Sequence, residues 1–216
     1  MKHGLVGAVA VALALGASSA AAQMIGNPVY VMVGMGTGVN IAGDFGRGIN
    51  NASGKGNYFG GRVTLGLPFF YVTAGAGTYK PQGATSSQTE FGGNLGLNLL
   101  HLPLVPVKVS AQAGAGYVKA GTNKVLDIPV ALGIGVSLPT PGVGITPWVA
   151  PRVQVHYETA AGVSSTKARF GASGGVNLHF SMIGVHAAVD YLRVASGVSP
   201  LTFGVGASVG LTLPGI

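Results

Sequence analysis

Histidines are the residues of this 216-residue chain best suited to chemistry, and two of them flank a predicted turn. A turn at 181–184 that sets Phe180 against Val185 would place His179 opposite His186. Directly opposed β-carbons lie about 4.5–5.5 Å apart, so the two imidazoles could share a metal ion. No third ligand stands nearby in the sequence, and two histidines alone rarely hold zinc. We therefore expect no metal and no other cofactor.

Histidine–carboxylate pairs are the candidates for acid–base chemistry. His186 and Asp190 share one face of a predicted strand, but their spacing of four residues corresponds to about 13 Å along that strand. His156 and Glu158 are two residues apart and have no obvious nucleophile beside them. The sequence therefore predicts no catalytic residue. An enzyme for hydrolysis or acyl transfer is kept as an alternative.

An ion pair between Arg152 and Asp190 is a more specific expectation. The register of the 181–184 turn also opposes Gly175 and Asp190. A hairpin at 160–165 places Arg152 opposite Gly175 on the other side. The two charged residues then flank one glycine, about 9.6 Å apart by backbone, and an arginine is long enough to reach over it.

The run Gly34-Met35-Gly36-Thr37-Gly38 has the look of a phosphate-binding loop. It opens no predicted helix and lacks the Gly-Lys-Ser ending of such loops. Its spacing equals the strand period. We therefore interpret these glycines as positions without side chains on one face of a strand.

Period-two alternation organises the chain. From Leu201 to Leu213 every odd residue is apolar, and every even residue is Gly, Ser or Thr. This period predicts strands, and 38 glycines disfavour helices. Each alternating segment is near or above the about 9–11 residues with which a tilted strand crosses a membrane. The ten segments are 28–41, 57–67, 69–80, 89–100, 106–119, 125–138, 146–159, 166–180, 184–196 and 201–213.

Composition and the connections between segments favour a membrane barrel. The mean hydropathy is +0.51 and 8% of residues are charged, where soluble domains carry roughly 25%. High apolarity without a second long apolar run predicts a closed barrel, because lipid tolerates no unpaired strand edge. Polar connections at 42–56, 81–88, 120–124, 160–165 and 197–200 are predicted to be external loops. Short ones at 67–68, 102–103, 138–139 and 181–184 are predicted periplasmic turns.

The first residues have the layout of a secretory signal peptide. Met1-Lys2-His3 is cationic, 4–17 is apolar, and Ala20 and Ala22 fit a cleavage site before Gln23. We expect a signal peptide at 1–22 and an outer-membrane β-barrel at 23–216. The chain has no cysteine.

The two faces of the predicted strands differ in polarity. The apolar face is assigned to lipid, and Val29, Val31, Val33, Val63, Leu95, Val153, Val189, Val205 and Val209 are among its members. Aromatic residues near the strand ends on this face predict an interfacial girdle: Phe59, Phe91, Tyr117, Tyr157, Phe170 and Tyr191 externally, and Phe69, Phe70 and Phe180 on the periplasmic side. The polar face is assigned to the lumen: Arg62, Asn94, Asn98, Lys108, Gln112, Arg152, Gln154, His156, Asn177, His179, His186 and Asp190.

Basic residues outnumber acidic ones at the predicted external side. Asp44, Glu90, Asp127 and Glu158 oppose a basic rim of Arg47, Lys55, Lys80, Lys119, Lys124, Lys167, Arg169 and Arg193. Such a rim suits phosphate-rich lipopolysaccharide, and generic solubilising charge is the alternative. Dispersed basic residues without a binding motif argue against nucleic acid.

The Ala20–Ala22 cleavage site, the ten segments and the Leu-Pro turns resemble small outer-membrane barrels, broadly the OmpA/OmpX-like and opacity-type membrane domains. The resemblance implies an all-β, closed antiparallel barrel in the outer membrane, with ten strands or alternatively eight. Its partners would be outer-membrane lipid, lipopolysaccharide and, during insertion, the barrel-assembly machinery. Those families usually end in an aromatic residue, whereas this chain ends Leu213-Pro214-Gly215-Ile216.

We expect a structural or porin-like barrel. Ten strands and inward glycines leave room for a narrow polar lumen, which the 42–56 loop could plug. The alternatives are a hydrolase or acyl-transfer enzyme near the external mouth and an adhesin that acts through the basic loops.

Overall fold

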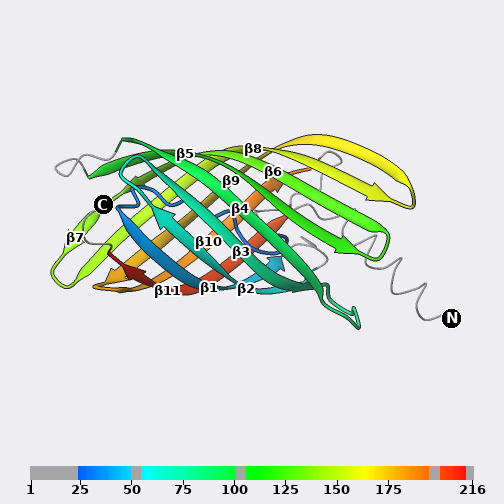
Figure 1. Ribbon diagram of the computed structural model, residues 1–216, viewed down its shortest axis with the longest axis horizontal. Helices are drawn as coiled ribbons and strands as arrows, with labels where there is room; N and C mark the ends of the chain where they lie inside the picture. The colour runs from blue at the N-terminus through cyan, green and yellow to red at the C-terminus, as the bar shows by residue number, and fades with distance from the viewer. Residues whose placement is uncertain (1–23, 50–54, 101–105, 195–199, 213–216) are drawn as a thin grey trace.

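The computed structural model describes residues 24–49, 55–100, 106–194 and 200–212, which form a single β-barrel (Figure 1). Its strands are β1 (Gly38–Ile49), β2 (Asn57–Gly66), β3 (Phe70–Lys80), β4 (Gln88–Leu100), β5 (Val107–Ala120), β6 (Asn123–Val136), β7 (Leu138–Thr140), β8 (Val143–Ala160), β9 (Val163–Phe180), β10 (Ile183–Arg193) and β11 (Leu201–Leu211). Among the described residues, no helix is long and apolar enough to cross a membrane.

The barrel closes with antiparallel pairs throughout. Strands β1 to β6 pair in chain order, and so do β7 to β11, while β1 pairs with β11 and β6 pairs with β8. The three-residue β7 follows β6 after one residue and pairs with the same strand β8, so the two form one interrupted barrel strand. The predicted ten-stranded closed barrel is therefore confirmed, and the eight-stranded alternative is wrong.

The two ends of the barrel differ in charge. The basic end carries the connections after β1, β3, β5, β8 and β10, together with most of the lysines. The opposite end, where β1 begins and β11 ends, is called the C-terminal end. Two of the predicted external loops are tight turns: β5 and β6 are separated by 121–122, and β8 and β9 by 161–162. Ala161 and Gly162 both have positive φ, as a type I′ hairpin turn requires.

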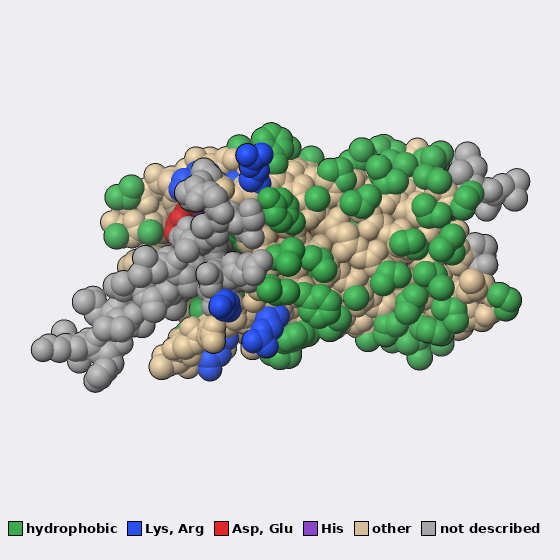
Figure 2. Space-filling model, turned by 180° about the vertical axis from the view of Figure 1, so that it is seen from behind, with side chains coloured by type: hydrophobic (Ala, Val, Ile, Leu, Met, Phe, Trp, Pro, Cys, Tyr) green, Lys and Arg blue, Asp and Glu red, His purple; other side chains and the backbone are tan. Residues whose placement is uncertain are grey.

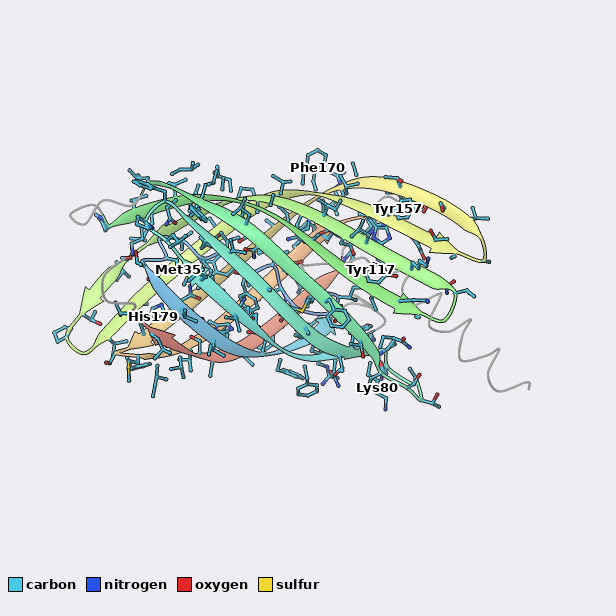
Figure 3. The ribbon with its side chains drawn as sticks, in the orientation of Figure 1. Met35, Lys80, Tyr117, Tyr157, Phe170 and His179 are labelled. Atoms are coloured by element: carbon cyan, nitrogen blue, oxygen red, sulfur yellow. The ribbon has the colours of Figure 1, made fainter. Side chains whose placement is uncertain are left out.

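The outer face is apolar, as the alternation predicts. Val63, Leu95 and Val209 are each about half exposed, and Figure 2 shows hydrophobic side chains spread over the barrel wall. Phe59, Phe91 and Phe170 are exposed near the basic end, and Phe69 is 77% exposed near the other. In Figure 3, Tyr117, Tyr157 and Phe170 lie toward the basic end of the barrel. This surface suits lipid with aromatic residues at both interfaces.

The first predicted strand, 28–41, is wrong. Residues 24–37 instead form an irregular segment inside the barrel, here called the lumen segment, and β1 begins only at Gly38. Val29 and Val31 were assigned to lipid, but they are 0% and 1% exposed within the lumen. The alternating valines suggested a strand with one face toward lipid. A segment enclosed by the barrel is apolar on all its sides and can show the same alternation. The predicted 42–56 loop is correspondingly wrong over its first half, which belongs to β1.

Inward glycines make space for the lumen segment. A β-carbon added at Gly133 would lie 2.4 Å from Val31 Cγ1, and one at Gly204 would lie 2.5 Å from Pro28 Cδ. Real β-carbons essentially never lie within 3.0 Å of such a heavy atom, so a side chain at either position would displace the segment. The prediction that glycine leaves lumen volume is therefore right, but a piece of the chain itself fills this volume.

Candidate functional site

The middle of the lumen contains the predicted Arg152–Asp190 ion pair. Arg152 Nη1 and Nη2 donate to the two Asp190 oxygens, with 2.8 Å for Nη2 to Oδ2. Ser173 Oγ bridges the pair: it accepts from Arg152 at 3.0 Å and donates to Asp190. Both charged residues are buried. Charge-assisted bonds of this two-pronged kind hold a carboxylate in a fixed orientation.

The register from which this pair was predicted is wrong. Asp190 pairs with Ser173, and Arg152 pairs with Gly171, so neither residue is opposite Gly175. The β8–β9 and β9–β10 hairpins are each closed by a two-residue turn, which is shorter than the predicted one. Both registers are therefore shifted in the same direction relative to the prediction. The predicted contact is nevertheless present, because the side chains of both residues point into the barrel as the alternation predicts.

A second charge cluster holds the lumen segment against the wall. Asp44 on β1 lies 3.3 Å from Arg62 Nε and 2.7 Å from His186 Nε2. The Arg62 guanidinium lies 4.2 Å from the ring centroid of Tyr30, and the His186 ring meets the same tyrosine edge-on at 4.8 Å. A cation over an aromatic face stabilises the contact without a hydrogen bond.

Polar wall residues also bind the backbone of the lumen segment. Glu90 accepts from Ile25 N–H at 2.6 Å, Gln112 donates to Tyr30 O at 3.3 Å, and Asn98 donates to Met35 O at 3.0 Å. Tyr71 in turn donates to Gln112 at 2.9 Å. The segment thus runs through the barrel from the basic end to the C-terminal end, and its buried backbone groups find partners along the way.

A third cluster lies toward the basic end. Asp127 Oδ1 is 2.7 Å from His156 Nδ1 and accepts from Gln154 at 2.8 Å. Glu158 Oε2 is 3.7 Å from His156 Nε2. Arg169 interacts electrostatically with Asp127 and Glu158. Carboxylate, imidazole and guanidinium groups therefore balance one another here.

Several predicted rim residues lie inside the barrel instead. Arg169, Asp44, Glu90 and Asp127 are all buried, because their strand phase points inward. The exposed rim comprises Arg47, Lys55, Lys80, Lys119, Lys124, Lys167 and Arg193. Its charge is accordingly more one-sided than the sequence suggested. Figure 2 shows Lys and Arg side chains gathered near one end of the apolar wall.

The predicted opposition of His179 and His186 is wrong. His186 pairs with Asn177, and His179 pairs with Gly184, because the β9–β10 turn contains only two residues. Within the described ranges, no group of three or more His, Cys, Asp or Glu residues is arranged to hold a metal ion.

A cavity of about 390 Å³ lies at the C-terminal end, here called the C-terminal cavity. The lumen segment from Tyr30 onward forms one side, and β-strand residues form the other. Its polar lining includes Arg62, Lys108, His179, His186, Asn40, Asn177, Thr146 and Ser208. Figure 3 places Met35 and His179 toward the same end of the barrel. The remaining predicted lumen residues, Asn94, Gln112, Arg152, Gln154, His156 and Asp190, are buried along the interior, and Asn98 is half-buried.

Large inward aromatic residues were missed by the sequence analysis. Tyr58, Tyr71, Tyr79 and Trp148 are all buried in the interior. Their signal was present in the strand phase: Tyr58 shares its parity with Arg62, and Trp148 shares its parity with Arg152. Trp148 packs in one cluster with Val29, Val31 and Val33 of the lumen segment.

The fold is similar to solved barrels of bacterial outer membranes. The β domain of the Bordetella autotransporter BrkA is 11% identical, with 80% of this chain and 98% of that chain covered and a TM-score of 0.53. The N-terminal β-barrel domain of Pseudomonas aeruginosa OprF is 13% identical, with 81% and 98% covered and a TM-score of 0.38. Neisserial surface protein A is 11% identical, with 80% and 97% covered and a TM-score of 0.40.

No family model matches the sequence, and no curated protein matches it. The similarity is therefore one of structure without sequence homology. In fold, this chain is a closed antiparallel β-barrel similar to the β domain of BrkA.

Proposed function

We propose that this chain is a structural envelope barrel that does not conduct, because the lumen segment seals it. The burial of Val29 and Val31 at the centre of the lumen carries this proposal. The Arg152–Asp190 pair and the Asp44–Arg62–His186 cluster add buried ion pairs within the lumen. A porin needs a continuous hydrated path, and close-packed side chains do not provide one.

Conductance in planar bilayers tests the seal. The folded full chain should give no steady open-channel current. Gly133→Ala combined with Gly204→Ala should displace the lumen segment and produce current bursts, since both new methyl groups meet it. Gly43→Ala is the matched control, because a β-carbon there has no atom within 4 Å. Steady ohmic current through the wild-type protein would overturn the proposal in favour of a porin.

The basic end is assigned to the external side of the outer membrane, where we expect it to bind lipopolysaccharide. Exposed Lys80, Lys119 and Lys167 lie close to the level of outward aromatic residues, so phosphate groups and acyl chains would each meet a suitable surface. Lys80→Gln with Lys119→Gln should weaken binding to vesicles that contain lipopolysaccharide. Binding to phosphatidylcholine vesicles should not change. Equal binding of both proteins to both vesicles would favour generic solubilising charge.

The Asp127–His156 pair is assigned a structural role, although it resembles half of a catalytic constellation. His156 Nε2 has no hydrogen-bond partner among the described residues. A general base needs such a free nitrogen to accept a proton. The side chain is only 1% exposed, however, and no hydroxyl group of the described residues bonds to it. His156→Gln should lower the unfolding free energy. The rate at which the protein hydrolyses a chromogenic ester should be the same in this variant as in the wild type. Ester hydrolysis that His156→Gln abolishes in a still folded barrel would favour the enzyme alternative.

A further inference from the structure

We propose that the C-terminal cavity binds a phosphate group, with Lys108 as its principal ligand. Lys108 stands on β5 and lines the cavity, where it is half-buried. It has no hydrogen bond and no ion pair within the described part of the chain. This separates it from Arg62 and Arg152, whose charges are each matched by a carboxylate. A half-buried ammonium without a counter-charge is a natural position for an anion.

Basic side chains line the cavity. Arg62, His179 and His186 line it with Lys108, and no carboxylate belongs to its described lining. Arg62 and His186 both pair with one carboxylate, that of Asp44. An anion would therefore enter a concave site in which the charge of Lys108 has no counter-charge from the described lining.

Neutral donors complete the site. Asn40, Asn177, Thr146 and Ser208 belong to the same lining and come from four different strands. A phosphate group has three acceptor oxygens and a charge of about −1.5 to −2, so it can use several donors at once. This number of donors favours phosphate over a carboxylate.

The glycine-rich run at 34–38 forms the remaining wall. Residues 34–37 lie in a loop rather than in the strand that their spacing predicts, Gly38 begins β1, and Gly34 has a φ of +65°. A β-carbon added at Gly36 would have no atom within 4 Å, so this side of the loop borders open space. Glycine permits an anion to approach the backbone closely. The cavity volume of about 390 Å³ suits a small molecule or one lipid headgroup.

Calorimetric titration of the folded full chain in a zwitterionic detergent tests the site. One arm uses inorganic phosphate, and a second arm uses short-chain phosphatidic acid. Saturable one-site binding of inorganic phosphate would support a free anion as the ligand. Binding of phosphatidic acid alone would support a lipid headgroup. No saturable binding in either arm would overturn the proposal.

Two variants locate the site. Lys108→Gln should weaken phosphate binding about tenfold or more, because it removes a charge-assisted hydrogen bond. Lys124→Gln, a matched control at the basic end, should leave the affinity unchanged. Gly36→Glu should also abolish binding, because its carboxylate would occupy the cavity while the wall stays intact; it serves if Lys108→Gln does not fold. Wild-type affinity in Lys108→Gln, or an equal loss in Lys124→Gln, would contradict the proposal.

Discussion

Charged side chains are paired with each other in the middle of the lumen, whereas a charged side chain at the C-terminal cavity has no counter-charge from the described lining. In the middle, Arg152 and Asp190 are buried, mutually paired and bridged by Ser173. At the C-terminal cavity, Lys108 is half-buried and faces open space without a partner among the described residues. The difference follows from packing: where the lumen segment fills the barrel, a charge must be compensated by protein. Where the lumen widens, solvent or a ligand can compensate it.

The largest expected effect comes from breaking the compensated pair. Arg152→Met should lower the unfolding free energy by about 3–5 kcal/mol, because it leaves the Asp190 carboxylate buried and unpaired. Guanidinium unfolding of the barrel in lipid vesicles measures this loss. The double variant Arg152→Met with Asp190→Leu should recover much of it. A single variant as stable as the wild type would show that the pair contributes nothing to the middle of the lumen.

The next effect tests the outer face of the same wall. Val205 is 36% exposed and points outward, while its neighbour Gly206 points inward toward His186 and Asp44. Val205→Arg should cost about 2–4 kcal/mol if the position faces lipid at mid-membrane. Unfolding in vesicles measures it, with Lys80→Arg at the exposed rim as the control. A neutral Val205→Arg would mean that this strand does not face lipid there.

A smaller effect probes the fit between the wall and the lumen segment. Gly204→Ala should cost about 1–3 kcal/mol, because the new methyl group overpacks against Pro28 and Tyr30. Gly43→Ala should not destabilise the barrel, since a β-carbon there meets no neighbour. Unfolding midpoints of the two variants give the comparison. Equal midpoints would argue that the segment does not lie against Gly204.

The smallest effect is expected at the C-terminal cavity. Lys108→Gln should change the unfolding free energy by about 0.5 kcal/mol or less, because no described protein group bonds to this ammonium. The same unfolding assay measures it. A loss as large as that of Arg152→Met would show that Lys108 has a protein partner, and the contrast between the two regions would disappear.

Much of the wall could be predicted from the sequence. Alternation gave the strand count and the inward phase of Arg62, Arg152 and Asp190, because a barrel strand has one face in lipid and one inside. Hairpin registers could not be predicted, since a turn such as 181–182 contains no Gly or Pro to mark its length. The predicted registers differ from the observed ones by two residues between β9 and β10 and by four between β8 and β9. Even-numbered differences preserve the phase, so the inward residues were right even where their partners were wrong.

The lumen segment was the main error. Val29-Tyr30-Val31-Met32-Val33 is apolar at every position, whereas wall strands such as 201–211 alternate. That continuous apolar run was the available signal for a segment enclosed on all sides. The burial of Arg169 and Asp127 was missed for a different reason. Both residues lie in segments that the alternation predicts as strands, 166–180 and 125–138, but the prediction counts them with the external rim although their strand phase points inward.

Disulfide trapping of the lumen segment tests the sealed barrel most directly. The chain contains no cysteine, so a pair introduced by Val31→Cys and Gly133→Cys has no competitor. A β-carbon at Gly133 would lie 2.4 Å from Val31 Cγ1, close enough for a disulfide after small adjustment. Peptide mapping of the oxidised, membrane-inserted protein should find the two introduced cysteines linked in most molecules, and no link for the control pair Val31→Cys and Gly43→Cys. Free thiols at both positions in the folded barrel would contradict the account.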